Sequence, residues 1–256
     1  MTIIMRTLIL SLTIACMASL ADLAAQPQLV THRGYWDCEG SAENSIASLK
    51  KSKDVNAYGS ELDVIITADG VPVVHHDSTI DGILIEEANY DQIKDRKLSN
   101  GEVLPTLESY LQAFKEIPDM KLVLEVKPHK RVVNEDRAVN AVLYMVERYQ
   151  VENRVDYISF SMNICKELRR RAPYAPVAYL KGDVSPVDLK RLGMDMDYHY
   201  EVFDKNPTWI KESKDLGVKV NVWTVNDPAI MQSLVEQDVD FITTNAPLEL
   251  NKILKH

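Results

Sequence analysis

Two carboxylates, Glu61 and Asp63, lie two residues apart in an otherwise mostly apolar run at 59–66. Side chains two residues apart on a strand leave the same face, so these two carboxylates should lie close together. Their mutual repulsion requires water or a cation between them, and the apolar surroundings argue against water. Glu125 occupies a second apolar run at 120–127. Because oxygen-only ligands suit hard divalent cations, the three residues predict a site for one divalent cation, Mg²⁺ or Ca²⁺.

His32 and His76 are the candidates for acid–base catalysis, because imidazole is the side chain that titrates near neutrality without help. Both follow apolar runs, and Asp77 or Glu43 could orient one of the rings. A purely structural role is the alternative for either histidine taken alone. His75 should point away from its neighbour in an extended segment, so we expect at most one of the adjacent histidines to face the site.

Arg33 and Lys127 would supply positive charge close to these groups. Cationic side chains suit a phosphate ligand better than a neutral sugar, and together with a metal ion they could stabilise charge on phosphoryl oxygens. The predicted reaction is therefore the cleavage of a phosphate ester. Trp223 is expected to contact the carbon chain of the substrate. Phe160 could form part of the same apolar wall, or it could be an aromatic residue buried in the barrel.

The elements that would position these residues alternate along the chain between strand-like and helix-like patterns. Strands are expected to begin near residues 29, 59, 120, 154, 177, 198, 218 and 240. Helices are expected at 43–50, 107–114, 137–149, 163–171, 186–192, 207–216, 228–237 and 247–254. Eight such units predict a closed (β/α)₈ TIM barrel, an α/β fold, with a small insertion at 78–118 after the second strand region. The alternative is an open doubly wound sheet, although no glycine-rich turn follows the first strand.

A barrel of this kind collects its catalytic groups at the carboxyl-terminal ends of its strands. Polar residues stand at the ends of several predicted strands, among them His32, Ser159, Asn226 and Asn245. The fold would therefore bring together residues that are far apart in the sequence.

The composition is that of a globular protein, with 46% hydrophobic and 26% charged residues. A net charge of -9 argues against a nucleic-acid partner and leaves a small-molecule substrate as the expected ligand. Residues 1–25 combine Arg6 with an apolar run at 7–21, which is typical of a signal peptide. We expect cleavage, export to the periplasm or beyond, and no membrane span in the mature 26–256 domain. An uncleaved anchor helix and a lipoprotein attached through Cys16 are the alternatives; Cys38 and Cys165 should be free thiols.

An ordered set of motifs resembles the glycerophosphodiester phosphodiesterase family. They are His32-Arg33-Gly34, Glu43-Asn44, Glu61-Leu62-Asp63-Val64, Asp69-Gly70-Val71-Pro72-Val73-Val74-His75-His76-Asp77, Glu125-Val126-Lys127, Trp223-Thr224-Val225-Asn226 and Asp240-Phe241-Ile242-Thr243-Thr244-Asn245-Ala246-Pro247. The set covers nearly the whole chain after residue 25. One departure is Ala42-Glu43-Asn44-Ser45, where the family usually has Pro-Glu-Asn-Thr.

The resemblance implies a TIM barrel that hydrolyses glycerophosphodiesters to glycerol 3-phosphate and an alcohol, with a cyclic phosphate as intermediate. It implies one divalent cation. The implied site residues are the metal ligands Glu61, Asp63 and Glu125, the acid–base pair His32 and His76, the phosphate-contacting Arg33 and Lys127, and the supporting Glu43 and Asn44. Two alternatives are a lysophospholipase D or sphingomyelinase D-like enzyme acting on lipid phosphodiesters, and a non-catalytic binding protein that kept the barrel.

Overall fold

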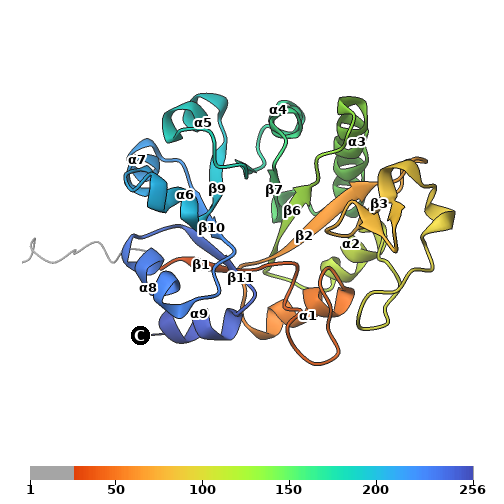
Figure 1. Cartoon of the computed structure of the whole chain (residues 1–256), viewed down its shortest axis with the longest axis horizontal. Helices are drawn as coiled ribbons and strands as arrows, with labels where there is room; N and C mark the ends of the chain where they lie inside the picture. Colours follow the sequence, from red (N-terminus) through yellow and green to blue (C-terminus); the bar gives the residue numbers. More distant parts are fainter. Residues whose placement is uncertain (1–25, 256) are drawn as a thin grey trace, which may run out of the picture.

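The structure is a computed structural model that describes residues 26–255. Its centre is a ring of parallel strands, which the helices surround (Figure 1). The strands are β1 (Gln28–Thr31), β2 (Gly59–Ile66), β6 (Lys121–Val126), β7 (Val155–Ser159), β8 (Val177–Tyr179), β9 (Asp195–His199), β10 (Val220–Trp223) and β11 (Phe241–Thr244). β1 pairs in parallel with both β11 and β2, which closes the ring. The predicted (β/α)₈ barrel is confirmed, and the open doubly wound sheet is wrong.

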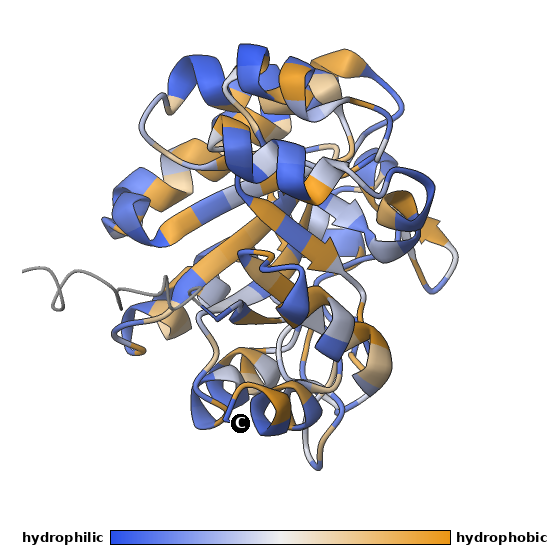
Figure 2. Cartoon of the chain, turned by 90° about the vertical axis from the view of Figure 1, so that its left-hand side faces the viewer, coloured by the Kyte–Doolittle hydropathy of each residue, from blue (hydrophilic) through white to orange (hydrophobic). Residues whose placement is uncertain are grey.

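Helices follow the strands and surround them. They are α1 (Ile46–Asp54), α2 (Leu107–Lys115), α3 (Val132–Tyr149), α4 (Met162–Arg171), α5 (Pro186–Leu192), α6 (Tyr200–Lys205), α7 (Trp209–Leu216), α8 (Pro228–Glu236) and α9 (Pro247–Ile253). Figure 2 shows largely hydrophobic strands, whereas the helices mix hydrophilic and hydrophobic residues. This distribution is expected for helices that bury one face and expose the other.

Two apolar layers hold the barrel together. Val30, Val123 and Ile158 form part of a cluster contributed by alternate strand positions. Their strand neighbours, such as Leu29 and Leu124, belong to the main core with the apolar faces of the helices. All eight residues of β2 are buried, as expected for a strand covered on both faces.

An excursion from the barrel follows β2 and packs on its own small core. It contains β3 (Pro72–Val74), β4 (Thr79–Ile80), β5 (Ile83–Leu84) and the 3₁₀ helices η1 (Ile85–Glu87) and η2 (Tyr90–Gln92). β3 pairs antiparallel with β2, and the apolar residues of the excursion cluster on Ile65. The excursion ends earlier than the predicted 78–118, because α2 packs against α1 and α3 and buries Phe114 in the main core. Helix α2 is thus part of the barrel wall, and the excursion covers 72–106.

The strand expected near residue 198 is β9, which begins at Asp195, and α6 begins at Tyr200. Polar Asp195, Asp197 and His199 alternate with apolar residues in β9, a pattern that made the strand hard to recognise. Helix α3 also begins earlier than predicted, at Val132.

The predicted signal peptide and the lipoprotein cysteine Cys16 lie outside the described residues. Over 26–255, no helix combines the length and the apolar character needed to cross a bilayer. Cys38 and Cys165 are free cysteines, as expected.

Candidate active site

The turn after β1 places His32 and Arg33 at the barrel mouth. Arg33 and Gly34 both adopt left-handed backbone conformations, with φ of 57° and 78°. A Cβ atom at Gly34 would lie 2.3 Å from Oγ of Ser48, so only glycine fits there. The turn directs the backbone N–H of Arg33 to Oε2 of Glu61, at 2.7 Å. The glycine therefore couples the end of β1 to the acidic residues of β2.

Glu61, Asp63 and Glu125 form a buried cluster, with one carboxylate oxygen from each lying within 4.8 Å of the others. Asp63 and Glu125 are directly opposite each other in the parallel register of β2 and β6. The sequence spacing and the strand pairing together produce the predicted convergence of the three side chains. This buried acidic triad could bind a metal ion.

The electrostatics of the triad fit a hard cation. Burial, reinforced by the neighbouring carboxylates, raises the pKa of Glu61 well above its usual value and that of Glu125 to about 8. Burial opposes ionisation of Asp63 as well, but the Lys127 ammonium and further hydrogen-bonding and charged neighbours lower its pKa to about 2. Nζ of Lys127 lies 3.1 Å from both Oδ1 of Asp63 and Oε1 of Glu125. Oε1 of Glu125 is buried, and this ion pair is its polar contact among the described residues. A buried, oxygen-only donor set of three carboxylates suits Mg²⁺ or Ca²⁺.

Asn44 fixes the position of Asp63. Its Nδ2 donates to Oδ2 of Asp63 at 2.9 Å, and its Oδ1 accepts the backbone N–H of Asp63 at 3.0 Å. Asn44 is 1% exposed and has a φ of 59°, a conformation that asparagine tolerates better than most residues. The helix cap beside it is Ser45, so the side chain of Asn44 remains available to Asp63.

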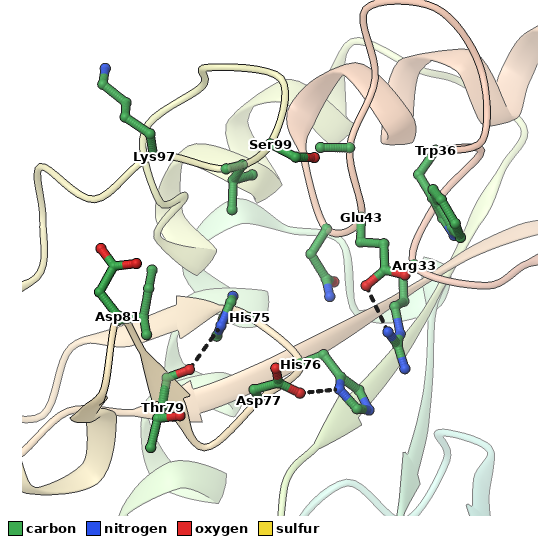
Figure 3. A pocket seen from close by; sticks show the side chains of 14 residues that line it. Arg33, Trp36, Glu43, His75, His76, Asp77, Thr79, Asp81, Lys97 and Ser99 are labelled. Carbon is green, nitrogen blue, oxygen red and sulfur yellow. Dashed lines mark hydrogen bonds and ion pairs between the residues drawn. The ribbon is translucent and has the colours of Figure 1, made fainter.

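Glu43 pairs with Arg33 rather than with a histidine. Nη1 of Arg33 donates to Oε2 of Glu43 at 2.7 Å (Figure 3). Nε of Arg33 lies 3.8 Å from Oδ2 of Asp63. Nε is buried and has no hydrogen-bond acceptor among the described residues. The guanidinium thus keeps an unused donor beside the acidic triad.

The two predicted acid–base histidines have different hydrogen-bond partners. Nδ1 of His32 lies 2.9 Å from Oδ1 of Asn245, and Nδ1 of His76 lies 2.8 Å from Oδ1 of Asp77. Burial, with a contribution from the Arg33 charge, lowers the pKa of His32 to about 4. His32 is therefore neutral at pH 7, and Asp77 is the residue that orients His76.

A cavity of about 520 Å³ opens between the loop after β1 and the excursion (Figure 3). It is lined by Arg33, Trp36, Ala42, Glu43, Asn44, His75, His76, Asp77, Thr79, Ile80, Asp81, Lys97, Leu98 and Ser99. We expected at most one of the adjacent histidines to face the site, but both line this cavity. His75 is turned towards the carbonyl of Thr79, whereas His76 is turned towards Asp77. The three carboxylates lie outside the lining, buried in β2 and β6.

Trp223 belongs to an aromatic group at the ends of neighbouring strands. Its ring meets Phe160 edge-on at a centroid distance of 5.5 Å and His199 at 5.3 Å, and its Nε1 donates to the carbonyl of Asp197. Both Phe160 and Trp223 are only partly buried. His199 was missed as a neighbour of Trp223 because the limits of β9 were misplaced.

Asn245 and Trp36 also lie at the site. Asn245 was recognised as a polar residue at a strand end and as part of a family motif, but its contact with His32 was not predicted. In the structure, the side chain of Asn245 contacts both His32 and Trp36. The strand-end position of Asn245 was the signal that could have indicated this contact.

A closed parallel barrel with three buried carboxylates converging from β2 and β6 defines a (β/α)₈-barrel enzyme with a site suited to a hard cation. The family model described as the glycerophosphoryl diester phosphodiesterase family matches residues 32–249. The chain belongs to this family, as the motifs predicted, and is a phosphoric diester hydrolase.

Similar proteins agree with this assignment. A crystal structure described as a glycerophosphodiester phosphodiesterase from Parabacteroides distasonis is 47% identical, with a TM-score of 0.89 over 90% of this chain and 97% of that one. A glycerophosphodiester phosphodiesterase from Caldanaerobacter subterraneus is 27% identical over 241 residues, which are 89% of this chain and 97% of that protein. An Oleispira antarctica phosphodiesterase, described in complex with the product sn-glycerol-3-phosphate, shares the fold at 24% identity and a TM-score of 0.77, covering 90% of this chain and 98% of that one.

Proposed function

We propose that the protein hydrolyses glycerophosphodiesters to glycerol 3-phosphate and an alcohol, using one divalent cation, Mg²⁺ or Ca²⁺. The observation that carries this proposal is the buried triad Glu61, Asp63 and Glu125, which lies beside the cations Arg33 and Lys127. The similarity to glycerophosphodiester phosphodiesterases over almost their whole length supports the choice of substrate.

The cation would be held by the three carboxylates, and when bound it would polarise the phosphoryl oxygens. The chain itself supplies two further positive charges. Lys127 already neutralises part of the triad, and Arg33 retains an unused Nε donor. Both would bind phosphoryl oxygens and stabilise the charge that develops on them.

His32 is neutral near pH 7 and so can accept a proton from the neighbouring hydroxyl of the glycerol group. That oxygen attacks phosphorus and displaces the alcohol, which leaves a cyclic phosphate. His76, whose Nδ1–H can be held by the Asp77 carboxylate, would protonate the departing oxygen. In the second half-reaction the histidines exchange roles: His76 takes a proton from water, the hydroxide opens the ring, and His32 returns its proton to the glycerol oxygen.

The substrate class is tested with glycerophosphocholine and lysophosphatidylcholine, each assayed with and without a chelator. We expect the water-soluble diester to be preferred and its turnover to be lost on chelation. Preference for lysophosphatidylcholine over glycerophosphocholine would support a lysophospholipase D-like activity instead. Preference for sphingomyelin over glycerophosphocholine would support a sphingomyelinase D-like activity. Full turnover in chelator would remove the cation from the mechanism.

The acid–base role is tested with His32→Ala. We expect a loss of about 10²-fold or more in kcat, because proton transfer by a positioned side chain contributes about 10²–10⁴-fold. The thermal unfolding midpoint of the same sample separates a catalytic loss from a folding defect. Unchanged turnover of every diester would instead favour a non-catalytic binding protein.

We also propose that residues 1–25 direct export and are removed. The support is Arg6 followed by the apolar run at 7–21. Determining the first residue of the mature protein tests this. A chain that begins at Cys16 and carries a lipid would favour the lipoprotein, and an intact Met1 would favour an uncleaved segment.

A further inference from the structure

A three-residue hydrogen-bonded group connects the loop after β1 to the end of β11. Nε1 of Trp36 donates to Oδ1 of Asn245 at 3.2 Å, and Nδ1 of His32 lies 2.9 Å from the same oxygen. Asn245 is held in place in turn, because its backbone N–H donates to Oδ1 of Asn226 at 2.9 Å. One amide oxygen thus serves both an indole and an imidazole.

The indole defines which end of the amide faces His32. An indole N–H can only donate, so the Asn245 atom that it meets must be the oxygen. A reversed amide would set an NH₂ group against the indole N–H and leave the indole without an acceptor. Because the oxygen can only accept, Nδ1 of His32 must carry a hydrogen. The other ring nitrogen, Nε2, then keeps its lone pair in the neutral ring.

We propose that Trp36 and Asn245 are positioning residues that together fix His32 as the Nδ1–H tautomer, with Nε2 as the proton acceptor. The catalytic part of this inference rests on the proposed function, whereas the tautomer itself does not. Burial of His32 supports the inference, since its pKa of about 4 keeps the ring neutral at pH 7.

The partner of His76 differs in charge. Asp77 places a negatively charged carboxylate on Nδ1 of His76, whereas the Asn245 amide that faces Nδ1 of His32 is neutral. The two histidines are therefore oriented by different kinds of acceptor. Trp36 also lines the 520 Å³ cavity, so the wall of the cavity and the orientation of the base share one residue.

The test is to observe the ring nitrogens of His32 by ¹⁵N NMR on labelled full-length protein near neutral pH. The His32 signals are assigned by comparison with His32→Gln. We expect a protonated Nδ1 and an unprotonated Nε2 in the wild type. A protonated Nε2 in the wild type would overturn the proposal, and this measurement requires neither substrate nor a variant of Asn245.

Variants then test the two positioning residues. Asn245→Leu keeps the approximate size of the side chain but removes the acceptor, so we expect loss of the Nδ1–H signature. We also expect a fall in kcat of about 10- to 10²-fold with little change in KM, the range found when a metal-bound histidine loses the group that orients its ring. Asn245→Asp retains an acceptor oxygen and should restore the Nδ1–H signature. An Asn245→Leu protein with the wild-type tautomer would refute the role of Asn245.

Trp36→Phe removes the indole donor while keeping an aromatic ring. We expect the amide to lose its fixed orientation and His32 to show a mixture of tautomers. Trp209→Phe, in helix α7, is the matched control and should leave the signature unchanged. An unchanged signature in Trp36→Phe would remove Trp36 from the proposal. If the tautomer is as expected but no glycerophosphodiester is hydrolysed, the proposed function fails and the positioning inference stands.

Discussion

Replacing Asn44 should destabilise the protein through two separate effects. The side chain of Asn44 makes two hydrogen bonds to Asp63, and its backbone is left-handed at a φ of 59°. Asn44→Ala removes both bonds, leaves the buried N–H of Asp63 without its acceptor, and places a Cβ-bearing residue with no local hydrogen bond in a left-handed conformation. Asn44→Gly removes the same bonds but suits this conformation.

The magnitudes follow from these contacts. A buried donor left unsatisfied costs about 1–3 kcal/mol. The left-handed conformation costs an ordinary residue about 1–2 kcal/mol. Asn44→Ala should therefore lower the free energy of unfolding by about 2–5 kcal/mol. Glycine avoids the second cost but loses about 0.4–1 kcal/mol more chain entropy, which leaves Asn44→Ala about 1 kcal/mol less stable than Asn44→Gly.

Urea unfolding of the wild type and both variants, all in chelator, measures these differences from the midpoints at a common slope. The chelator prevents a change in cation affinity from contributing to the apparent stability. An Asn44→Ala protein within about 0.5 kcal/mol of the wild type, the range of an ordinary surface substitution, would refute the reasoning. An Asn44→Ala protein about 0.4–1 kcal/mol more stable than Asn44→Gly, the difference expected from chain entropy alone, would retain the hydrogen bonds and reject the backbone strain.

Three further predictions concern the turn after β1, the buried histidine and the acidic triad. Gly34→Ala should unfold at a lower urea concentration than Gly40→Ala, because the new Cβ atom at position 34 would collide with Ser48. Gly40 is also left-handed, but a Cβ atom there would meet no atom within 4 Å, so equal unfolding midpoints would contradict this prediction. His32 has a pKa of about 4 when folded and near 6.5 when unfolded, so the unfolded chain binds more protons between these values. The wild type should therefore lose more stability than His32→Gln as the pH falls through that window, and parallel pH profiles of unfolding free energy would count against the burial of a neutral ring. Adding Mg²⁺ or Ca²⁺ without substrate should raise the Tm of the wild type but not that of Glu61→Gln, and an equal rise in both would place the cation elsewhere.

The acidic triad could be predicted from the sequence only in part. The two-residue spacing of Glu61 and Asp63 already determines that they share a strand face. That Glu125 lies opposite Asp63 depends on the register between β2 and β6, which no local pattern encodes. The count of strand–helix units and the family motifs made the proximity of Glu125 to Asp63 predictable. They did not make the hydrogen bonds that support the triad predictable.

Other features depended on packing that the sequence does not express locally. The helical pattern of α2 was visible at 107–114, but its place in the barrel wall depends on contacts with α1 and α3. The polar alternation at Asp195, Asp197 and His199 resembles an exposed segment, although Asp197 is 1% exposed. The sequence around Asn44 is equally compatible with a helix cap at this residue. Only the contact of Asn44 with Asp63 in the structure identifies its role.

The contact between His32 and Asn245 has a consequence for the order of folding. The two residues are separated by 213 positions, one following the first barrel strand and the other following the last. Contacts this distant in sequence form late, because a long loop must close before they yield any stabilisation. A growing chain would therefore complete the acidic triad long before it acquired the partner of His32. Under the proposed mechanism, catalytic competence would appear only when β11 docks beside β1, and the recovery of activity during refolding would report on the closure of the barrel.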